Sequence, residues 1–210
     1  LFPFLQEAVF TGTVTPVLPP LLVFYGAWAS GAAFSLNPVG DEGPVLPVTL
    51  TTPVSGRAFV GGLCLAGLLL GVPITLLVAG ATGVLSGLQP LALGTVVLTA
   101  VALPVAATGI AVGAGTLFPR MDEVEVWRGV ETTAPSLFAF GLYSLVLGVA
   151  GIPATLVSTP DTRDLITDLA GVTETVAIAG GLAATLAVAS LAAVVGYRYA
   201  VRSFDDYYLG

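Results

Sequence analysis

Histidine and lysine are absent from the sequence, and cysteine occurs once, as Cys64. Without imidazole and with a single thiol, the chain lacks the usual ligands of zinc and cannot form an internal disulfide. The absence of histidine also excludes a Ser-His-Asp triad or a histidine-activated cysteine nucleophile. No glycine-rich phosphate loop followed by lysine occurs, so the chain is not itself a P-loop ATPase.

Charged residues are scarce and unevenly placed. Asp, Glu, Lys and Arg make up 9% of the 210 residues, and none of them occurs from Ala58 to Pro119. One charge at the centre of a bilayer costs about 2.5–3.5 kcal/mol on insertion scales. The mean hydropathy of +0.99 is far above that of a soluble domain. We therefore predict an all-α, polytopic transmembrane helix bundle in the cell membrane, with the lipid bilayer as its surroundings.

Five spans are predicted, because about 20 helical residues cross the hydrocarbon layer. They lie at residues 16–36, 58–80, 91–117, 134–157 and 174–200 of a single transmembrane domain that covers 1–210. Loops 37–57 and 118–133 and the C-terminus then share one side of the membrane, and loops 81–90 and 158–173 lie on the other. The first side is predicted to be cytoplasmic because it holds five of the six arginines. These are Arg57, Arg120, Arg128, Arg198 and Arg202, with Arg163 on the other side.

Glycine and proline punctuate the predicted spans. Glycine pairs four residues apart, which let helices approach closely, occur at Gly67 and Gly71, Gly83 and Gly87, and Gly109 and Gly113. In a chain with 26 glycines this spacing also arises by chance, and chance is the interpretation we favour for each pair. Prolines within spans, where they kink helices, are Pro73, Pro104 and Pro153.

The balance of acidic and basic residues indicates what kind of organism the protein comes from. All six cations are arginines, and the net charge is −7. This acidic balance is expected of proteins bathed in concentrated salt, which predicts a halophilic archaeon, although a GC-rich genome explains the composition equally well. The sequence begins at Leu1 without a charged leader, so we expect it to be the C-terminal portion of a longer chain.

Candidate chemical groups lie mainly outside the spans. No charge falls inside a predicted span away from its ends, which disfavours a proton-driven pump. Acidic pairs such as Asp41 with Glu42 lie in loops, where solvated charge is the simpler interpretation. Cys64 is expected to be a small core residue. We predict no catalytic residue and no metal site.

The first predicted cytoplasmic loop reads NPVGDEGPVLPVTLTTPVSGR from Asn37 to Arg57. Pro53 disfavours a helix through its predecessor, and Ser55 can cap a helix that follows, which predicts a short helix at the membrane surface. A plain interfacial loop is the alternative. Glu42, Gly43 and the run from Leu50 to Ser55 resemble the EG and LLxTPVS element of ABC-type exporter permeases.

A second segment carries the same resemblance. Gly115 to Asp122 reads GTLFPRMD, which is similar to the Phe-Pro-Arg segment that follows a later span in a subgroup of these permeases. The residues of the second loop that match are Phe118, Pro119, Arg120 and Asp122. Both segments occur in the order expected of the family, and together with the spans they cover nearly all of the chain.

The resemblance implies a permease subunit of an ATP-driven exporter. In that family the first element docks on a separate ABC ATPase subunit, which binds ATP and Mg²⁺, so this chain itself binds no cofactor. The expected ATPase-coupling residues are Asp41, Glu42, Gly43, Thr52, Pro53, Val54, Ser55 and Arg57. The subunit is expected to form a homodimer or to pair with another permease half, and not to bind nucleic acid. A non-transporting membrane scaffold or assembly protein is the alternative.

Overall fold

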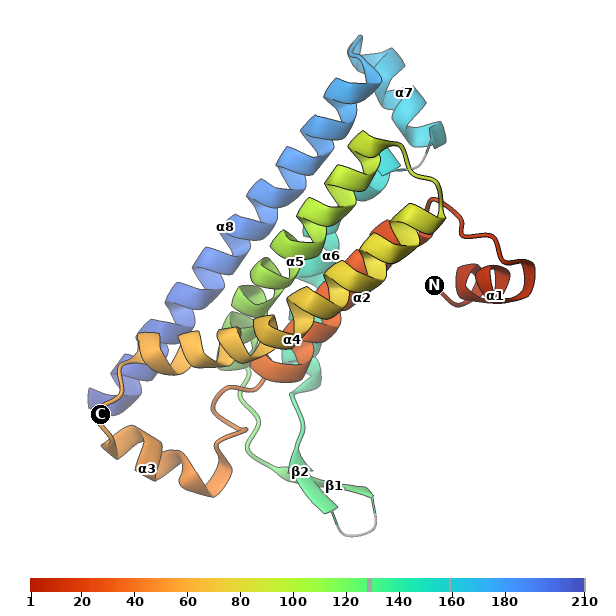
Figure 1. Cartoon of the computed structure of the whole chain (residues 1–210). Coiled ribbons are helices and arrows are strands. Elements are labelled where there is room, and N and C mark those ends of the chain that lie inside the picture. Colours follow the sequence, from red (N-terminus) through yellow and green to blue (C-terminus); the bar gives the residue numbers. More distant parts are fainter. Residues whose placement is uncertain (128–129, 159, 210) are drawn as a thin grey trace.

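The structure is a computed structural model that describes residues 1–127, 130–158 and 160–209. Five long helices form a bundle, and short helices and one β-hairpin lie at its ends (Figure 1). The bundle helices are α2 (Leu18–Ser35), α4 (Gly56–Leu85), α5 (Pro90–Leu117), α6 (Leu137–Ser158) and α8 (Glu174–Leu209). The predicted all-α bundle is therefore confirmed.

Four of these helices, α4, α5, α6 and α8, are long and apolar enough to cross a membrane. The chain is thus a multi-pass membrane protein. The first predicted span, 16–36, corresponds to α2, which has 18 residues, carries no charge and packs against α4 and α5, but is not among the four. The chain runs up and down the bundle, so α2, α5 and α8 end where α4 and α6 begin (Figure 1).

Helix α5 lies at the centre of the bundle, between α2, α4, α6 and α8. Ten consecutive residues of α5, from Ala106 to Gly115, are buried. A helix buried on every side must be apolar all round, and one that is closely surrounded in lipid needs small side chains. Alanine and glycine fill most of this stretch, so neighbouring helices approach α5 closely.

Two of the three glycine pairs lie at helix contacts, so chance spacing is the wrong interpretation for these two. A side chain at Gly113 would place its Cβ 2.4 Å from the Cα of Gly196, on α8. At Gly71 the same atom would lie 2.3 Å from the Cβ of Ser30, on α2. Gly83 and Gly87 do not form such a pair, because Gly87 lies beyond the end of α4 with a φ of 67°.

Polar side chains of neighbouring helices satisfy backbone groups inside the bundle. The N–H of Ala154, which follows Pro153 inside α6, donates to Thr185 Oγ1 of α8 at 2.9 Å. The Tyr143 hydroxyl donates to the carbonyl oxygens of Ala27 (3.2 Å) and Trp28 (2.8 Å) of α2. Because lipid offers no hydrogen bonds, such contacts hold the helices in register.

The connections differ from the predicted loops. Helix α4 continues to Leu85, which leaves 86–89 as the link to α5, and α8 continues beyond the predicted span end at 200 to Leu209. Loop 158–173 contains helix α7 (Pro160–Ala170), whose N-terminal turn is acidic. Loop 118–133 contains strands β1 (Glu123–Trp127) and β2 (Val130–Thr133), paired antiparallel. The alternation of acidic residues with valine in this segment is typical of a strand. The prediction of a plain loop over 118–133 is therefore wrong for these residues.

Besides α7, two short helices lie outside the bundle. Helix α3 (Leu46–Thr51) follows the 3₁₀ turn η1 (Gly43–Val45) and lies near the C-terminal end of α8 (Figure 1). Helix α1 (Phe2–Thr11) has no buried residue and stands apart from the other helices.

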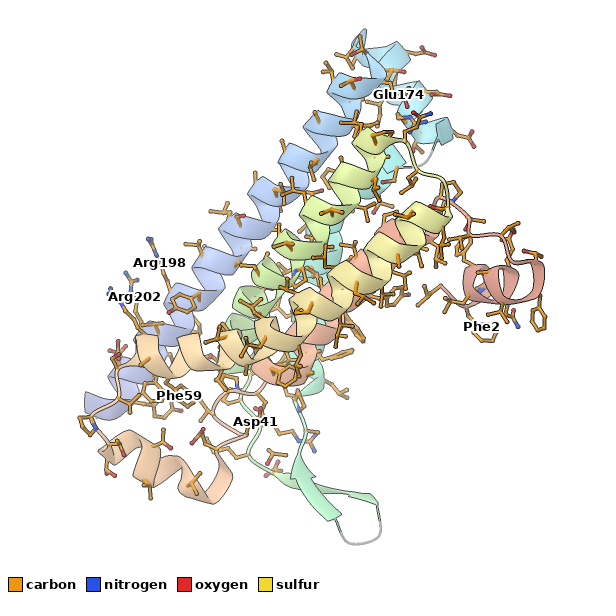
Figure 2. All side chains as sticks on the ribbon, viewed as in Figure 1. Phe2, Asp41, Phe59, Glu174, Arg198 and Arg202 are labelled. Carbon is orange, nitrogen blue, oxygen red and sulfur yellow. The ribbon has the colours of Figure 1, made fainter. Side chains whose placement is uncertain are left out.

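The arginines divide between the two ends of the bundle. Arg57 is the second residue of α4, and Arg198 and Arg202 lie near the end of α8 (Figure 2). Arg120 follows α5 and joins them at what we call the arginine-rich end, whereas Arg163 lies on α7 at the opposite end. Arg128 lies outside the described residues. The assignment of the arginine-rich end to the cytoplasm stays a prediction.

Candidate functional site

The two loops that resemble the permease elements are in direct contact at the arginine-rich end. Asn37 Nδ2 donates to the carbonyl oxygen of Arg120 at 3.0 Å, and the N–H of Arg120 donates to Asn37 Oδ1 at 3.2 Å. Asn37 is 1% exposed. One buried amide therefore binds both backbone groups of a residue 83 positions away, and it fixes the first loop against the second.

Small residues make this close contact feasible. A Cβ at Gly40 would lie only 2.0 Å from the Arg120 carbonyl oxygen, and one at Gly115 would lie 2.2 Å from the carbonyl oxygen of Leu36. Both glycines flank the Asn37–Arg120 contact in sequence. The backbones of the two loops thus touch without intervening side chains, which is the role of glycine where two chain segments cross.

The first loop folds onto itself through Glu42. The hydroxyl of Thr49, on α3, donates to Glu42 Oε2 at 2.6 Å. Gly43 follows with a φ of +48°, a conformation that favours glycine, and this turn directs the chain into η1 and α3. Val45 and Val48 are 56% and 65% exposed. The EG dipeptide therefore positions a short helix that presents apolar side chains away from the bundle.

The segment from Thr52 to Ser55 connects α3 to α4. Thr52 is extended, with a ψ of 144°, as expected of a residue before proline, and Pro53 is exposed. The N–H of Val54 donates to the Thr52 carbonyl oxygen at 2.7 Å. Ser55 is the N-cap of α4, and its Oγ accepts from the N–H of Ala58 at 3.3 Å. The predicted cap is confirmed, but the short helix lies before Pro53 rather than after it.

The start of α4 is bound to the end of α8. The N–H of Gly56 donates to Asp205 Oδ1 at 2.7 Å, which places a carboxylate at the positive end of the helix dipole. The rings of Phe59 and Phe204 stack with centroids 4.4 Å apart. The part of α8 beyond the predicted span end at 200 is therefore a structural part of this end of the protein.

The remaining predicted residues are exposed around this contact. Arg57 is exposed, and its carbonyl oxygen accepts from the Tyr197 hydroxyl at 3.4 Å. The carbonyl oxygen of Phe118 accepts from Ser136 Oγ at 2.8 Å, which ties the start of α6 to the second loop. Pro119 and Asp122 are exposed. Arg57 and Asp122 make no side-chain contact with the other predicted site residues among the hydrogen bonds and ion pairs described for this part of the chain.

The carboxyl group of Asp41 lies near the contact between the two loops, where its pKa differs from the ordinary value of an aspartate (Figure 2). Partial burial raises the pKa of its carboxyl above the ordinary value. A hydrogen bond with the Asn37 side chain lowers the pKa and opposes this effect, while the neighbouring charge of Glu42 raises it further.

These hydrogen bonds hold the two loops and the helix ends together beneath exposed apolar side chains. Within residues 1–127, 130–158 and 160–209, no group of three or more His, Cys, Asp or Glu side chains is placed to hold a metal. The exposed side chains are Val45 of η1 and Val48 of α3. The segments beneath them are held by hydrogen bonds of the Asn37, Glu42 and Asp205 side chains.

Sequence reasoning did not identify Asn37 and Asp205. Asn37 is the first polar residue after a charge-free helix and precedes proline, which is a recognisable signal of a helix end with a bonded amide. Asp205 carries no local signal, because its partner Gly56 is 149 residues away.

The contribution of Asp205 is measurable by substitution. Asp205→Ala is expected to lower the free energy of unfolding by about 1 kcal/mol, since it removes a side-chain cap from α4. Asp205→Asn, which still offers an oxygen to the Gly56 N–H, is expected to lose less. Thermal unfolding in mild detergent measures the difference, with the exposed neighbour changed in Asp206→Ala as the control. Equal melting temperatures for the two alanine variants would contradict the capping role.

Comparison with family models, with curated proteins and with solved structures finds no significant match to this chain.

Proposed function

We propose that the protein is the membrane-spanning permease subunit of an ATP-driven ABC-type exporter in the cell membrane. The observation that carries the proposal is the double hydrogen bond between Asn37 and Arg120, because it joins the two loops whose sequences resemble that family. Neither loop was expected to contact the other from sequence. Their contact at the end that presents α3 supports a single surface for docking of the ATPase.

The geometry suggests how force would pass from the partner to the helices. The ATPase would press on the exposed side of α3, which is joined to α4 through Pro53 and Ser55. Asn37 and Asp205 connect the same region to Arg120 and to α8. A displacement of α3 would then move several helices together, as a rigid-body transition requires. ATP and Mg²⁺ belong to the partner, and a second permease half would complete the pathway.

The single cysteine permits a direct test by cross-linking. In a Cys64→Ser background, Val48→Cys on α3 places the one thiol on the proposed docking surface. Leu169→Cys on α7 is the matched control, since Leu169 is also an exposed apolar residue (79%) but lies at the opposite end of the bundle. A thiol cross-linker is added to membranes of cells that produce the full-length protein. We expect Val48→Cys, and not Leu169→Cys, to capture a protein with a P-loop ATPase sequence.

Two further results separate the exporter from a scaffold. The cross-linked yield should change when ATP and Mg²⁺ are added, because a transporting partner alternates between conformations, whereas a passive scaffold contact should not respond. Cross-linking of an ATPase from Leu169→Cys with equal yield, or of no ATPase from Val48→Cys in cells that contain the assembled complex, would refute the docking surface.

A further inference from the structure

A groove of about 770 Å³ lies between α4, α5 and α8 near the arginine-rich end. It is separate from α3 and from the Asn37–Arg120 contact. Its lining combines charged residues near the helix ends with apolar residues from the middle of the helices. The residues used below are Arg57, Leu68, Val105, Val194, Arg198 and Arg202.

The outer part of the groove carries more positive than negative charge. Arg57, Arg198 and Arg202 are all exposed, and none of them takes part in the one ion pair found among the described residues, which joins Arg163 to Glu174. Arg198 and Arg202 are one helical turn apart and extend from the same side of α8 (Figure 2). Three like charges around one groove repel each other unless an anion lies among them.

The one acid described in the lining does not neutralise them. Asp205 contributes one negative charge, and its Oδ1 accepts a hydrogen bond from the N–H of Gly56 at the start of α4. Three arginines against one aspartate leave an excess of positive charge in the groove.

The inner part of the groove is apolar and has the depth of one membrane leaflet. Leu68 lies 11 residues after Arg57 on α4, which corresponds to about 16 Å along a helix. Val194 precedes Arg202 by 8 residues on α8, or about 12 Å. Half of the hydrocarbon core is about 15 Å thick. The groove therefore extends from the arginines to about the depth that an acyl chain occupies.

We infer that this groove binds an anionic phospholipid, with the headgroup phosphate at Arg57, Arg198 and Arg202 and an acyl chain along Leu68, Val105 and Val194. Arginine binds phosphate oxygens in a bidentate manner, and basic pockets between membrane helices suit anionic headgroups. A free phosphate or nucleotide would leave the apolar part of the groove empty, and a neutral lipid would leave the arginines without a counter-charge. The groove would bind this lipid whether or not the chain is an exporter subunit.

The test measures lipid binding to the purified full-length protein in mild detergent. Phosphatidylglycerol and phosphatidylcholine are titrated separately, and bound lipid is counted by native mass spectrometry. We expect phosphatidylglycerol to bind more tightly than phosphatidylcholine. Arg198→Gln combined with Arg202→Gln should weaken phosphatidylglycerol binding about 25-fold, since each arginine near a charged membrane surface contributes about fivefold. Arg163→Gln, which removes a cation at the opposite end, should leave the affinity unchanged.

A second variant tests the apolar half of the groove and does not alter the charges. Val194→Trp fills the inner part while the three arginines remain, so it should also weaken phosphatidylglycerol binding. Glycerol phosphate is added as a competitor that has the headgroup chemistry without a chain. Melting temperatures verify that each variant is folded.

Several outcomes would overturn the inference. Equal affinity for the two lipids, or no loss in the double arginine variant, would show that the arginines do not select an anionic lipid. Competition by glycerol phosphate at the same concentration as the lipid, with no effect of Val194→Trp, would show a site for phosphate alone. Disulfide-linked dimers of Val194→Cys in a Cys64→Ser background would show that a second copy of the chain covers the groove.

Discussion

Gly113→Ala is expected to destabilise the bundle by about 1–3 kcal/mol, although it adds only one methyl group. The new Cβ would lie 2.4 Å from the Cα of Gly196, which is backbone and cannot rotate away. Helices α5 and α8 would have to separate, and the packing along their contact would be lost. Thermal unfolding in mild detergent, followed by size-exclusion chromatography of the remaining monodisperse protein, measures the loss.

A matched substitution on the same helix should have the opposite sign. Gly94, also on α5, has no atom within 4 Å of the position where a Cβ would be added. Gly94→Ala should therefore stabilise the protein by about 0.5–1 kcal/mol, because alanine loses less conformational freedom in a helix than glycine does. If both variants shifted the melting temperature in the same direction, the conclusion that α5 and α8 approach closely at Gly113 would be wrong.

Asn37→Ala is expected to cost about 1–3 kcal/mol and to release the two loops from each other. The substitution leaves the N–H and the carbonyl oxygen of Arg120 without their partner, and unsatisfied groups are more costly than a lost hydrogen bond alone. Hydrogen exchange gives a local readout, since the Arg120 amide should exchange faster in the variant than in the wild type. The melting temperature should fall in parallel.

Two control variants test whether the effect comes from the hydrogen bonds of the Asn37 amide. Asn37→Asp keeps an acceptor for the Arg120 N–H but removes the donor to the carbonyl oxygen, so it should be intermediate in both readouts. Gln6→Ala removes an exposed amide on α1 and should change neither. Unchanged exchange at Arg120 in Asn37→Ala would mean that the amide does not hold the loops together.

Much of the bundle was predictable because each helix carries its own signal. A run without charges that exceeds the bilayer thickness has to fold as helices, and polar or proline-containing breaks mark the turns. The predicted third span, 91–117, matches α5 within one residue because Pro90 starts it. Helix α4 exceeded its predicted end by five residues, to Leu85, because its last turns are as apolar as the rest and contain no break.

The candidate site was predictable only in part, because some of its residues act through the local backbone and others through distant partners. The roles of Gly43 and Ser55 depend on the local backbone, a positive φ and an N-cap, so the sequence of the loop indicates them. The contacts of Asn37 with Arg120 and of Asp205 with Gly56 join residues 83 and 149 positions apart. No local pattern encodes such pairs.

The sequence by itself determined the membrane environment, the helical fold and the gathering of arginines at one end, since these depend on composition and on the length of apolar runs. Only the tertiary structure decided which glycines lie between helices, which loops touch and where a groove forms among the arginines. The physical reason is that insertion into a membrane depends on each helix separately, whereas packing in lipid depends on the shapes of two surfaces that meet. Gly113 and Gly87 each follow another glycine by four residues, but only Gly113 faces another helix.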